Sequence, residues 1–185
     1  KNNFGINLKN LNSVGKKSSK YKSSLQSELV SLYNLDVSFP LKKNSQTSQN
    51  YLTPKLSLRF NPHDMKNYSS SARNIDAHNA FAINRLGLSD TLESGRSLTL
   101  GLDYSNQQKN NLNKINNYFE LKLATVLRDR EEKFVPNNST IHRKSSNLFG
   151  SIKNKFSENI EIGYNFSLDN DINTLEYNDI NTTVS

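Results

Sequence analysis

The sequence predicts an all-β protein: an antiparallel up-and-down transmembrane β-barrel, of which this chain supplies about eight strands as a sheet that stays open in isolation. Apolar and polar residues alternate along several segments, as they do when side chains point to opposite faces of a strand. No apolar run is long enough for a spanning helix, whereas a spanning strand needs only about ten residues. Long or basic connections alternate with shorter ones, which is typical of the two rims of a barrel.

The composition fits a single domain without disulfide or thiol chemistry. The chain has 185 residues, and we expect residues 1–185 to be one partial barrel domain from the interior of a longer protein. Cysteine is absent, which excludes a disulfide framework. Only 34% of the residues are hydrophobic, so a disordered chain is the first alternative, but the regular alternation argues against disorder. The net charge of +7 is spread along the chain and favours solvated loop ends over a dedicated anion site.

The alternation places the strands in order along the chain. Pro40 ends the second strand because proline cannot donate a backbone hydrogen bond, and Pro62 closes the third. The best-defined strand alternates Leu98, Leu100 and Leu102 with small or polar residues, and a weaker pattern near the end of the chain gives the last strand. The expected strands cover residues 4–9, 25–39, 52–60, 96–104, 119–128, 148–156, 160–168 and 174–181.

The connections between these strands differ in length and composition. A loop rich in serine and lysine follows the first strand, and a polar turn is expected over Leu41–Asn50. The longest connection, residues 63–94, is expected to be functional or exposed, and Ala77–Leu86 within it is compatible with a short helix or strand. The remaining connections cover residues 106–116, 129–145 and 157–159.

The two faces of the predicted strands have opposite character. One face carries Leu, Ile, Phe, Tyr and Val, with aromatic residues near strand ends that resemble an interfacial girdle: Phe39, Phe60, Tyr104 and Phe156. The other face carries charges in mid-strand: Glu28, Asp36, Lys55, Arg59, Asp103, Glu120, Lys122, Arg128 and Glu161. We expect the apolar face to meet lipid and the charged face to line a wet lumen, where opposite charges pair across neighbouring strands. A soluble protein would instead bury the apolar face in a dry core.

The residues give no support for catalysis or for nucleic-acid binding. His63, His78 and His142 all fall in loops without partners at metal-ligand spacing, and surface histidines are the better interpretation. The acidic residues near Glu131 lie among arginines and lysines, as in a mixed-charge loop. No nucleophile elbow or phosphate loop occurs. The aromatic residues mostly lie on the face opposite the basic ones, which counts against stacking on nucleic-acid bases. We therefore expect no enzyme activity, no cofactor, no metal and no nucleic-acid partner.

Residues 79–104, NAFAINRLGLSDTLESGRSLTLGLDY, resemble the lipopolysaccharide-transport outer-membrane protein family LptD, also called the organic-solvent-tolerance family. The sequence departs from the family pattern at Leu86, Gly87 and Thr91, and the Pro-containing strand around Pro54 and the approach to the strand at Leu148 are also similar. The matching positions are Phe81, Asn84, Arg85, Asp90, Glu93, Arg96, Leu98, Thr99 and Gly101.

The resemblance implies the central part of the C-terminal barrel of such a protein in the cell outer membrane. It implies that the barrel passes lipopolysaccharide to the outer leaflet, holds an LptE-like lipoprotein in its lumen and joins the periplasmic lipopolysaccharide-transport bridge through a preceding N-terminal domain. Outer-membrane lipid is then a further partner. The structural motif residues are expected to be Phe81, Asn84, Arg85, Asp90, Glu93, Arg96 and Gly101. Two alternatives stay open: another outer-membrane porin or receptor barrel, and a soluble all-β surface-binding module.

Overall fold

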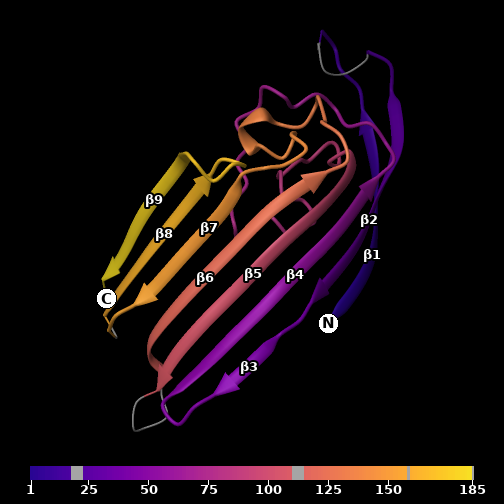
Figure 1. Ribbon diagram of the computed structural model, residues 1–185. Helices are drawn as coiled ribbons and strands as arrows, with labels where there is room; N and C mark the ends of the chain where they lie inside the picture. Colours follow the sequence, from indigo (N-terminus) through magenta and orange to yellow (C-terminus); the bar gives the residue numbers. More distant parts are fainter. Residues whose placement is uncertain (18–22, 110–114, 158, 185) are drawn as a thin grey trace.

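A computed structural model describes residues 1–17, 23–109, 115–157 and 159–184. These residues form one antiparallel sheet in the order β1-β2-β4-β5-β6-β7-β8-β9, with β3 paired to β4, so almost every strand lies beside its neighbour in sequence (Figure 1). In chain order the elements are β1 (Asn2–Ser13), β2 (Gln26–Ser38), β3 (Leu41–Asn44), β4 (Ser48–Asn61), β5 (Gly95–Lys109), β6 (Ile115–Arg128), the 3-10 helix η1 (Asn137–Ser139), β7 (Leu148–Lys155), β8 (Ile160–Leu168) and β9 (Leu175–Val184).

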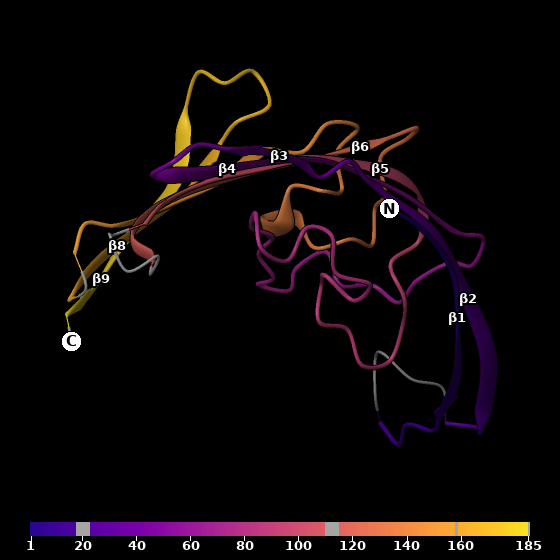
Figure 2. The same ribbon diagram turned by 90° about the horizontal axis from the view of Figure 1, so that it is seen from below.

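The sheet is strongly curved, and two long connections fold into its hollow side. Figure 2 shows the connection over residues 62–94 and the part of the 129–147 connection around η1 inside the arc that the strands describe. Hydrogen bonds join these connections to the wall; Arg59 of β4, for example, donates to the carbonyl oxygen of Ala82 at 2.7 Å. We call the side that holds the two connections the concave face and the opposite side the convex face.

The apolar face of the strands is the convex one. The register places Leu58 opposite Leu98 and Leu98 opposite Leu127, so these leucines share one face. Leu58 is 47% exposed and Leu100 is 39% exposed, although both lie within long strands. Leu98, Leu100, Leu121, Leu123, Ile162 and Phe166 all stay outside the buried hydrophobic clusters of the described chain. The predicted alternation is confirmed, and the apolar face does not converge on a dry core.

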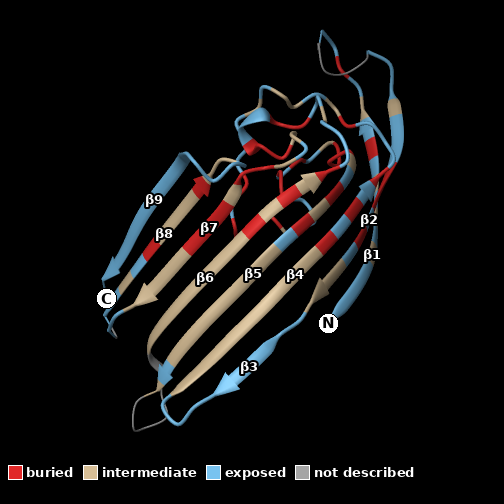
Figure 3. Cartoon of the chain, viewed as in Figure 1, coloured by how far each residue is buried: buried red, intermediate tan, exposed pale blue. Residues whose placement is uncertain are grey.

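The buried apolar residues lie on the other side, between the concave face and the two folded-in connections. Figure 3 shows buried positions concentrated in the ends of the central strands that lie nearest the long connections. The larger cluster comprises Met65, Ile75, Ala77, Ala80, Leu86, Leu88, Ala124, Val126, Val135, Ile141 and Phe149. A second cluster joins Leu11 of β1 and Val30 and Leu32 of β2 to Leu92. The core of this structure is therefore made by connections packing on a wall.

The connection lengths agree with the predicted two-rim pattern. The connections that contain residues 62–94 and 129–147 leave the sheet at one end, where the β1–β2 and β8–β9 connections also lie (Figure 1). At the other end β3 and β4 are joined through residues 45–47, and Phe156 closes a turn by donating to the carbonyl oxygen of Ile160 at 3.1 Å. β5 and β6 extend to Lys109 and from Ile115, so the predicted turn over 106–116 is shorter than expected, and residues 110–114 lie outside the described part.

Two local predictions are wrong. The segment Leu41–Asn50 is a strand hairpin rather than a polar turn, because Leu41–Asn44 pairs with the first residues of β4. The backbone hydrogen bonds of this ladder stabilise a strand that the polar sequence does not predict. The segment Ala77–Leu86 forms successive turns, neither helix nor strand, since its backbone follows the surface of the wall. The weak pattern near the end of the chain is a true strand, β9. Among the described residues, no helix is long and apolar enough to span a membrane.

A proline in the middle of β4 coincides with a break between β2 and β3. Pro54 pairs with Leu102 of β5 on one side, and on the other its carbonyl oxygen accepts a hydrogen bond from the backbone of Phe39 at 3.0 Å. Proline has no N–H to give in return. The neighbouring ladder is interrupted at Phe39 and Pro40, which lie between β2 and β3, so the missing donor falls where the partner strand is already broken.

Candidate functional site

A buried cluster of charges fastens the two folded-in connections to the wall. Glu93, at the end of the first connection, accepts a hydrogen bond from Arg85 Nε at 2.7 Å through its Oε2 atom. Its Oε1 atom contacts both Arg85 Nη2 and Arg128 Nη2. Arg85 belongs to the first connection, whereas Arg128 is the last residue of β6. One carboxylate therefore binds an arginine of its own connection and an arginine of β6, which is 35 residues further along the chain.

Arg85 uses its remaining donors to hold the first connection against β5. Its Nη1 atom donates to Thr99 Oγ1 at 2.9 Å, and its Nη2 atom donates to Ser97 Oγ at 3.0 Å. A further bond to the carbonyl oxygen of Ala80, at 3.3 Å, stays within the connection. Ser97 and Thr99 are buried, so the guanidinium group binds their hydroxyl groups away from solvent.

Arg128 and Arg59 complete the attachment from the wall. Arg128 donates through Nη1 to the carbonyl oxygen of Ser94 at 2.9 Å and through Nε to the carbonyl oxygen of Ile141, so it contacts both connections. Arg59 donates through Nη1 to Ala82, as described above, and through Nη2 to the next carbonyl oxygen of the same connection. Backbone carbonyl groups without sheet partners thus find donors in the wall.

The cluster places one acid among three arginines. Burial alone would raise the pKa of Glu93, but the charges of Arg85, Arg128 and Arg59 together with the hydrogen bonds from Arg85 lower it well below its usual range. Glu93 therefore stays ionised at neutral pH. Removing one partner of a buried ion pair is strongly destabilising. Loss of the Glu93 carboxylate would leave the positive charges of Arg85, Arg128 and Arg59 without it.

The ring of Phe81, in the first connection, packs directly on Gly101 of β5. A Cβ atom placed on Gly101 would lie 2.6 Å from Cε2 of Phe81, so only a residue without a side chain lets the ring lie so close to β5. Lys55 of β4 places its ammonium group 5.5 Å from the centre of the same ring, and it pairs with Asp103. The close approach explains why a glycine interrupts an otherwise regular strand.

The other motif residues shape the connection or lie elsewhere. Asn84 closes a turn on Leu88 by accepting its backbone N–H at 2.8 Å and donating to its carbonyl oxygen at 3.0 Å. Gly87 in the same turn has a φ of 62°, a conformation that side chains disfavour. Asp90 accepts a hydrogen bond from the hydroxyl group of Tyr68. Arg96 does not join the buried cluster.

The titratable loop residues do not gather into a catalytic or metal-binding arrangement. His78 Nε2 lies 3.0 Å from Ser151 Oγ and helps to attach the first connection to β7, while His63 is exposed. His142 is half-buried rather than a plain surface residue, and burial lowers its pKa together with the charge of Arg143. Across the described part of the chain, no three histidine, aspartate or glutamate residues lie close enough together to hold a metal ion.

A comparison with protein families decides what kind of protein this wall belongs to. The model of the family described as LPS transport system D, LptD, matches residues 6–185. The chain belongs to the LptD family. A search of curated proteins finds no match for it.

Membership in the LptD family gives the chain a role in lipopolysaccharide transport and assembly in the outer membrane. LptD proteins transport lipopolysaccharide and are not classed as enzymes, so the buried charges are interpreted as structural. Lipopolysaccharide and other components of the same transport system are the partners that the family implies. The all-β sheet with one exposed apolar face agrees with a barrel of the outer membrane.

Within this LptD-family chain, sequence reasoning found Arg85 and Glu93 but did not connect them to the wall. Arg59 and Arg128 were recognised only as mid-strand charges of the polar face. The signal that unites them is the register, because Arg59 pairs with Ser97 and Ser97 pairs with Arg128, which places the three side chains in one row across β4, β5 and β6.

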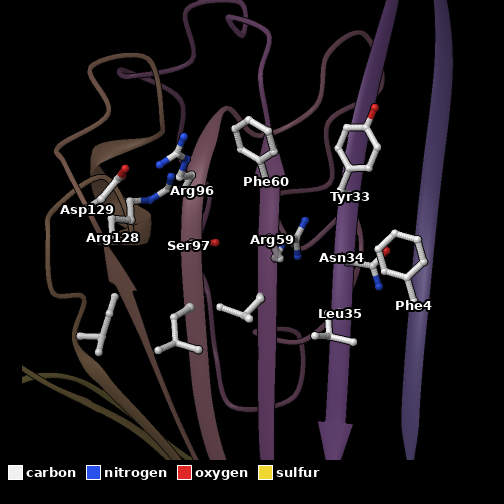
Figure 4. Close-up of a pocket in the computed structure, with 13 residues that line it drawn as sticks. Phe4, Tyr33, Asn34, Leu35, Arg59, Phe60, Arg96, Ser97, Arg128 and Asp129 are labelled. Carbon is white, nitrogen blue, oxygen red and sulfur yellow. The ribbon is translucent and has the colours of Figure 1, made fainter.

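Arg96 lies on the convex face of the same sheet. Its guanidinium carbon is 5.2 Å from the ring centre of Phe60, and Phe60 stacks on Tyr33 with ring centres 6.2 Å apart. These side chains border a shallow, mostly apolar groove of about 540 Å³ that also includes Phe4 and Leu35 (Figure 4). An exposed apolar groove on the outer surface of a sheet is typical of a surface that meets lipid or another apolar partner.

Proposed function

We propose that residues 1–185 form one partial barrel domain, part of the wall of an outer-membrane barrel that passes lipopolysaccharide to the outer leaflet. The observation that supports the proposal most directly is the reversed polarity of the sheet. The convex face exposes leucines in mid-strand, whereas the concave face carries arginines, serines and threonines under the two connections. A wall with hydrocarbon outside and a polar lumen inside has this distribution.

The width of the apolar band suits a bilayer. Along β4, the convex positions from Leu52 to Phe60 are apolar, and the register sets Leu56 opposite Leu100 at the middle of this band. A tilted spanning strand needs about 9–11 residues. Phe60 lies at one end of the band and Tyr104 pairs with Leu52 at the other, where aromatic side chains meet the lipid headgroups.

The concave face suits a polar cargo. Lys153 and Glu161 pair at 2.7 Å on neighbouring strands, and Lys55 pairs with Asp103 in the same manner. Such paired charges are compatible with water and with sugars that carry hydroxyl and phosphate groups. An LptE-like lipoprotein in the lumen and a periplasmic bridge reached through an N-terminal domain are the further partners that we propose.

The connections suggest an orientation for the wall. Outer-membrane barrels have short periplasmic turns and longer extracellular loops. We therefore assign the rim that carries residues 62–94 and 129–147 to the cell surface, and the rim with the β3–β4 turn to the periplasm. The family membership favours lipopolysaccharide assembly over a porin or receptor, and the exposed convex leucines disfavour a soluble surface-binding module.

Depletion of the full-length protein tests this function. Cells that lose the protein should lose newly made lipopolysaccharide from the surface, measured by labelling intact cells with an antibody or lectin against its sugars. Re-expression should restore the label, and depletion of an abundant porin should leave it unchanged. Normal surface lipopolysaccharide after complete depletion would contradict the proposal.

A further inference from the structure

A pocket on the concave face shares no lining residue with the charge cluster. It has a volume of about 320 Å³ and lies between the first connection, the second connection and strands β7, β8 and β9. This volume is at the lower end of the range for small-molecule sites, about 300–1,000 Å³. Phe149 and Phe166 are among its apolar lining residues, and its amides, carboxylates and tyrosine are Asn74, Asp76, Asn147, Asn165, Glu176 and Tyr177.

Asn147 forms part of the wall of this pocket and has a carbonyl oxygen that lacks a partner. The side chain is only 1% exposed. Its Nδ2 atom donates to Glu176 Oε2 at 2.6 Å and to Ser167 Oγ at 2.8 Å, so both amide hydrogens are used. A carboxylate can only accept, which fixes the orientation of the amide. The Oδ1 atom has no hydrogen-bond partner among the described residues, and an unpaired buried acceptor costs stability.

The charge of the pocket selects against anionic ligands. Asp76 and Glu176 are among its lining residues, whereas none of the described residues that line it is a lysine or an arginine. A phosphate group would therefore meet two negative charges without a positive one. An uncharged ligand with several hydroxyl groups matches the site, because each hydroxyl can donate to a carboxylate or amide oxygen and accept from an amide N–H.

Tyr177 supplies the remaining feature of a sugar-binding surface. It lies on β9, pairs in register with Ser167 beside Asn147, and is 54% exposed. Its ring offers an apolar face next to a row of hydrogen-bonding groups, a combination that holds a flat, amphipathic ring. The apolar C–H face of a sugar can lie on the tyrosine while its hydroxyl groups reach the amides and carboxylates.

We propose that this pocket, between the two connections and β7–β9, binds an uncharged sugar unit. The inference rests on the proposed function, because a barrel that transports lipopolysaccharide brings saccharide into its lumen. It goes further in two ways: it assigns the saccharide a binding place on the wall, and it distinguishes the uncharged sugars of lipopolysaccharide from the phosphorylated ones. Unphosphorylated sugars bind here, whereas phosphorylated sugars are repelled.

Binding of two defined saccharides to the full-length protein tests this assignment. The first probe is an unphosphorylated oligosaccharide built only from neutral hexoses. The second is the deacylated, phosphorylated glucosamine disaccharide of the lipid anchor. Saturation-transfer NMR in detergent should detect the first and not the second. Stronger binding of the phosphorylated disaccharide would overturn the proposal.

Variants of β9 localise the binding to this pocket. Tyr177→Ala should raise the dissociation constant of the unphosphorylated oligosaccharide about tenfold, since it removes the stacking surface. Asn178→Ala, on the opposite face of the same strand, is the matched control and should bind as the wild type does. Glu176→Gln keeps the shape of the side chain but removes its negative charge. It should reduce the difference between the dissociation constants of the two probes. Unchanged binding in Tyr177→Ala would also overturn the proposal.

The two proposals fail in different ways. If the protein transports lipopolysaccharide by another route across its surface, depletion still removes surface lipopolysaccharide but the oligosaccharide does not bind. If the protein has another transport role, depletion leaves surface lipopolysaccharide unchanged whatever the binding result.

Discussion

Glu93 accepts hydrogen bonds from two buried arginines, and a third arginine lies close enough to lower the pKa of its carboxyl group. Such a cluster costs free energy to desolvate, and its net effect on stability depends on complete pairing. Its clearest effect here is geometric. The arginines come from β4, β6 and the first connection, so the cluster forms only when all three are in place.

Replacing Glu93 with glutamine should destabilise the fold by about 3–5 kcal/mol, because it leaves buried arginines without a countercharge. The measurement is urea-induced unfolding of the full-length protein in lipid vesicles. Glu131→Gln, the same change at an exposed position of the second connection, is the control and should have little effect. Equal stability of the two variants would show that the cluster is not required.

The pH dependence of stability should carry the signature of the same carboxylate. The pKa of Glu93 is lower in the folded protein than its unfolded value of about 4.3, so its contribution is present above that pH and is lost as the pH falls below it. Unfolding midpoints recorded from pH 7 to pH 3 should therefore fall more steeply for the wild type than for Glu93→Gln. Parallel curves would contradict this assignment.

The contact between Phe81 and Gly101 makes a second prediction for single residues. Gly101→Ala should destabilise the protein by about 1–3 kcal/mol, because the new methyl group overlaps the ring. A smaller side chain at position 81 should relieve the overlap. Gly101→Ala should therefore lower the free energy of unfolding by less in a Phe81→Leu background. A double-mutant cycle on urea midpoints measures this coupling. Additive effects would show that the ring is not the obstacle.

At the scale of elements, the strands have an apolar convex face and a polar concave face. The register sets Leu100 of β5 opposite Leu56 of β4 at the middle of the apolar band, and both point to the convex side. Gln107 of the same strand lies on the concave face, beyond the apolar band. The strand thus offers two positions at which the same substitution meets different surroundings.

Leu100→Arg should destabilise the barrel in lipid vesicles by about 2–4 kcal/mol, the cost of an arginine at the bilayer midplane. Gln107→Arg should change the stability little, because its side chain faces water. Urea unfolding monitored by protease protection provides the measurement. A similar cost at both positions would indicate that the convex face does not meet hydrocarbon.

The strands could be predicted from the sequence because alternation is a local property. It identified the apolar face and the weak last strand, while β3 escaped because Leu41–Asn44 has too short a pattern to distinguish from a turn. The attachment of the connections was not predictable in the same way. Arg85 lies before β5 and Arg128 ends β6, and only the pairing of β5 with β6 and the packing of the first connection on them bring both arginines to one carboxylate.

At the scale of the molecule, the described strands form an open sheet. β1 pairs only with β2 and β9 pairs only with β8, so each outer strand has a row of backbone groups without a strand partner among the described residues. Exposed edges of this kind pair readily with other strands. In a membrane such groups must be paired, and closure of the barrel supplies the partners.

Residues 1–185 expressed alone should therefore fail to form a stable barrel in detergent. The segment should migrate identically on a gel with and without heating, whereas the full-length protein should shift on heating. Fusing the segment to the remaining strands of its parent should restore the shift. A heat-modifiable, monomeric 185-residue segment would contradict a partial barrel.

The proline in β4 has a mechanical consequence for the wall. β2 and β4 share six residue pairs, from Tyr33 to Ser38, whereas β4 and β5 share fourteen, and the shorter joint ends at the interruption beside Pro54. The β1–β2 hairpin is thus joined to β4 by few backbone pairs. The packing of Leu92 on Val30 and Leu32 adds a contact that holds the hairpin from the concave side. Deuterium should enter the amides of this joint before those of β5, and sooner still when Leu92 is shortened to alanine.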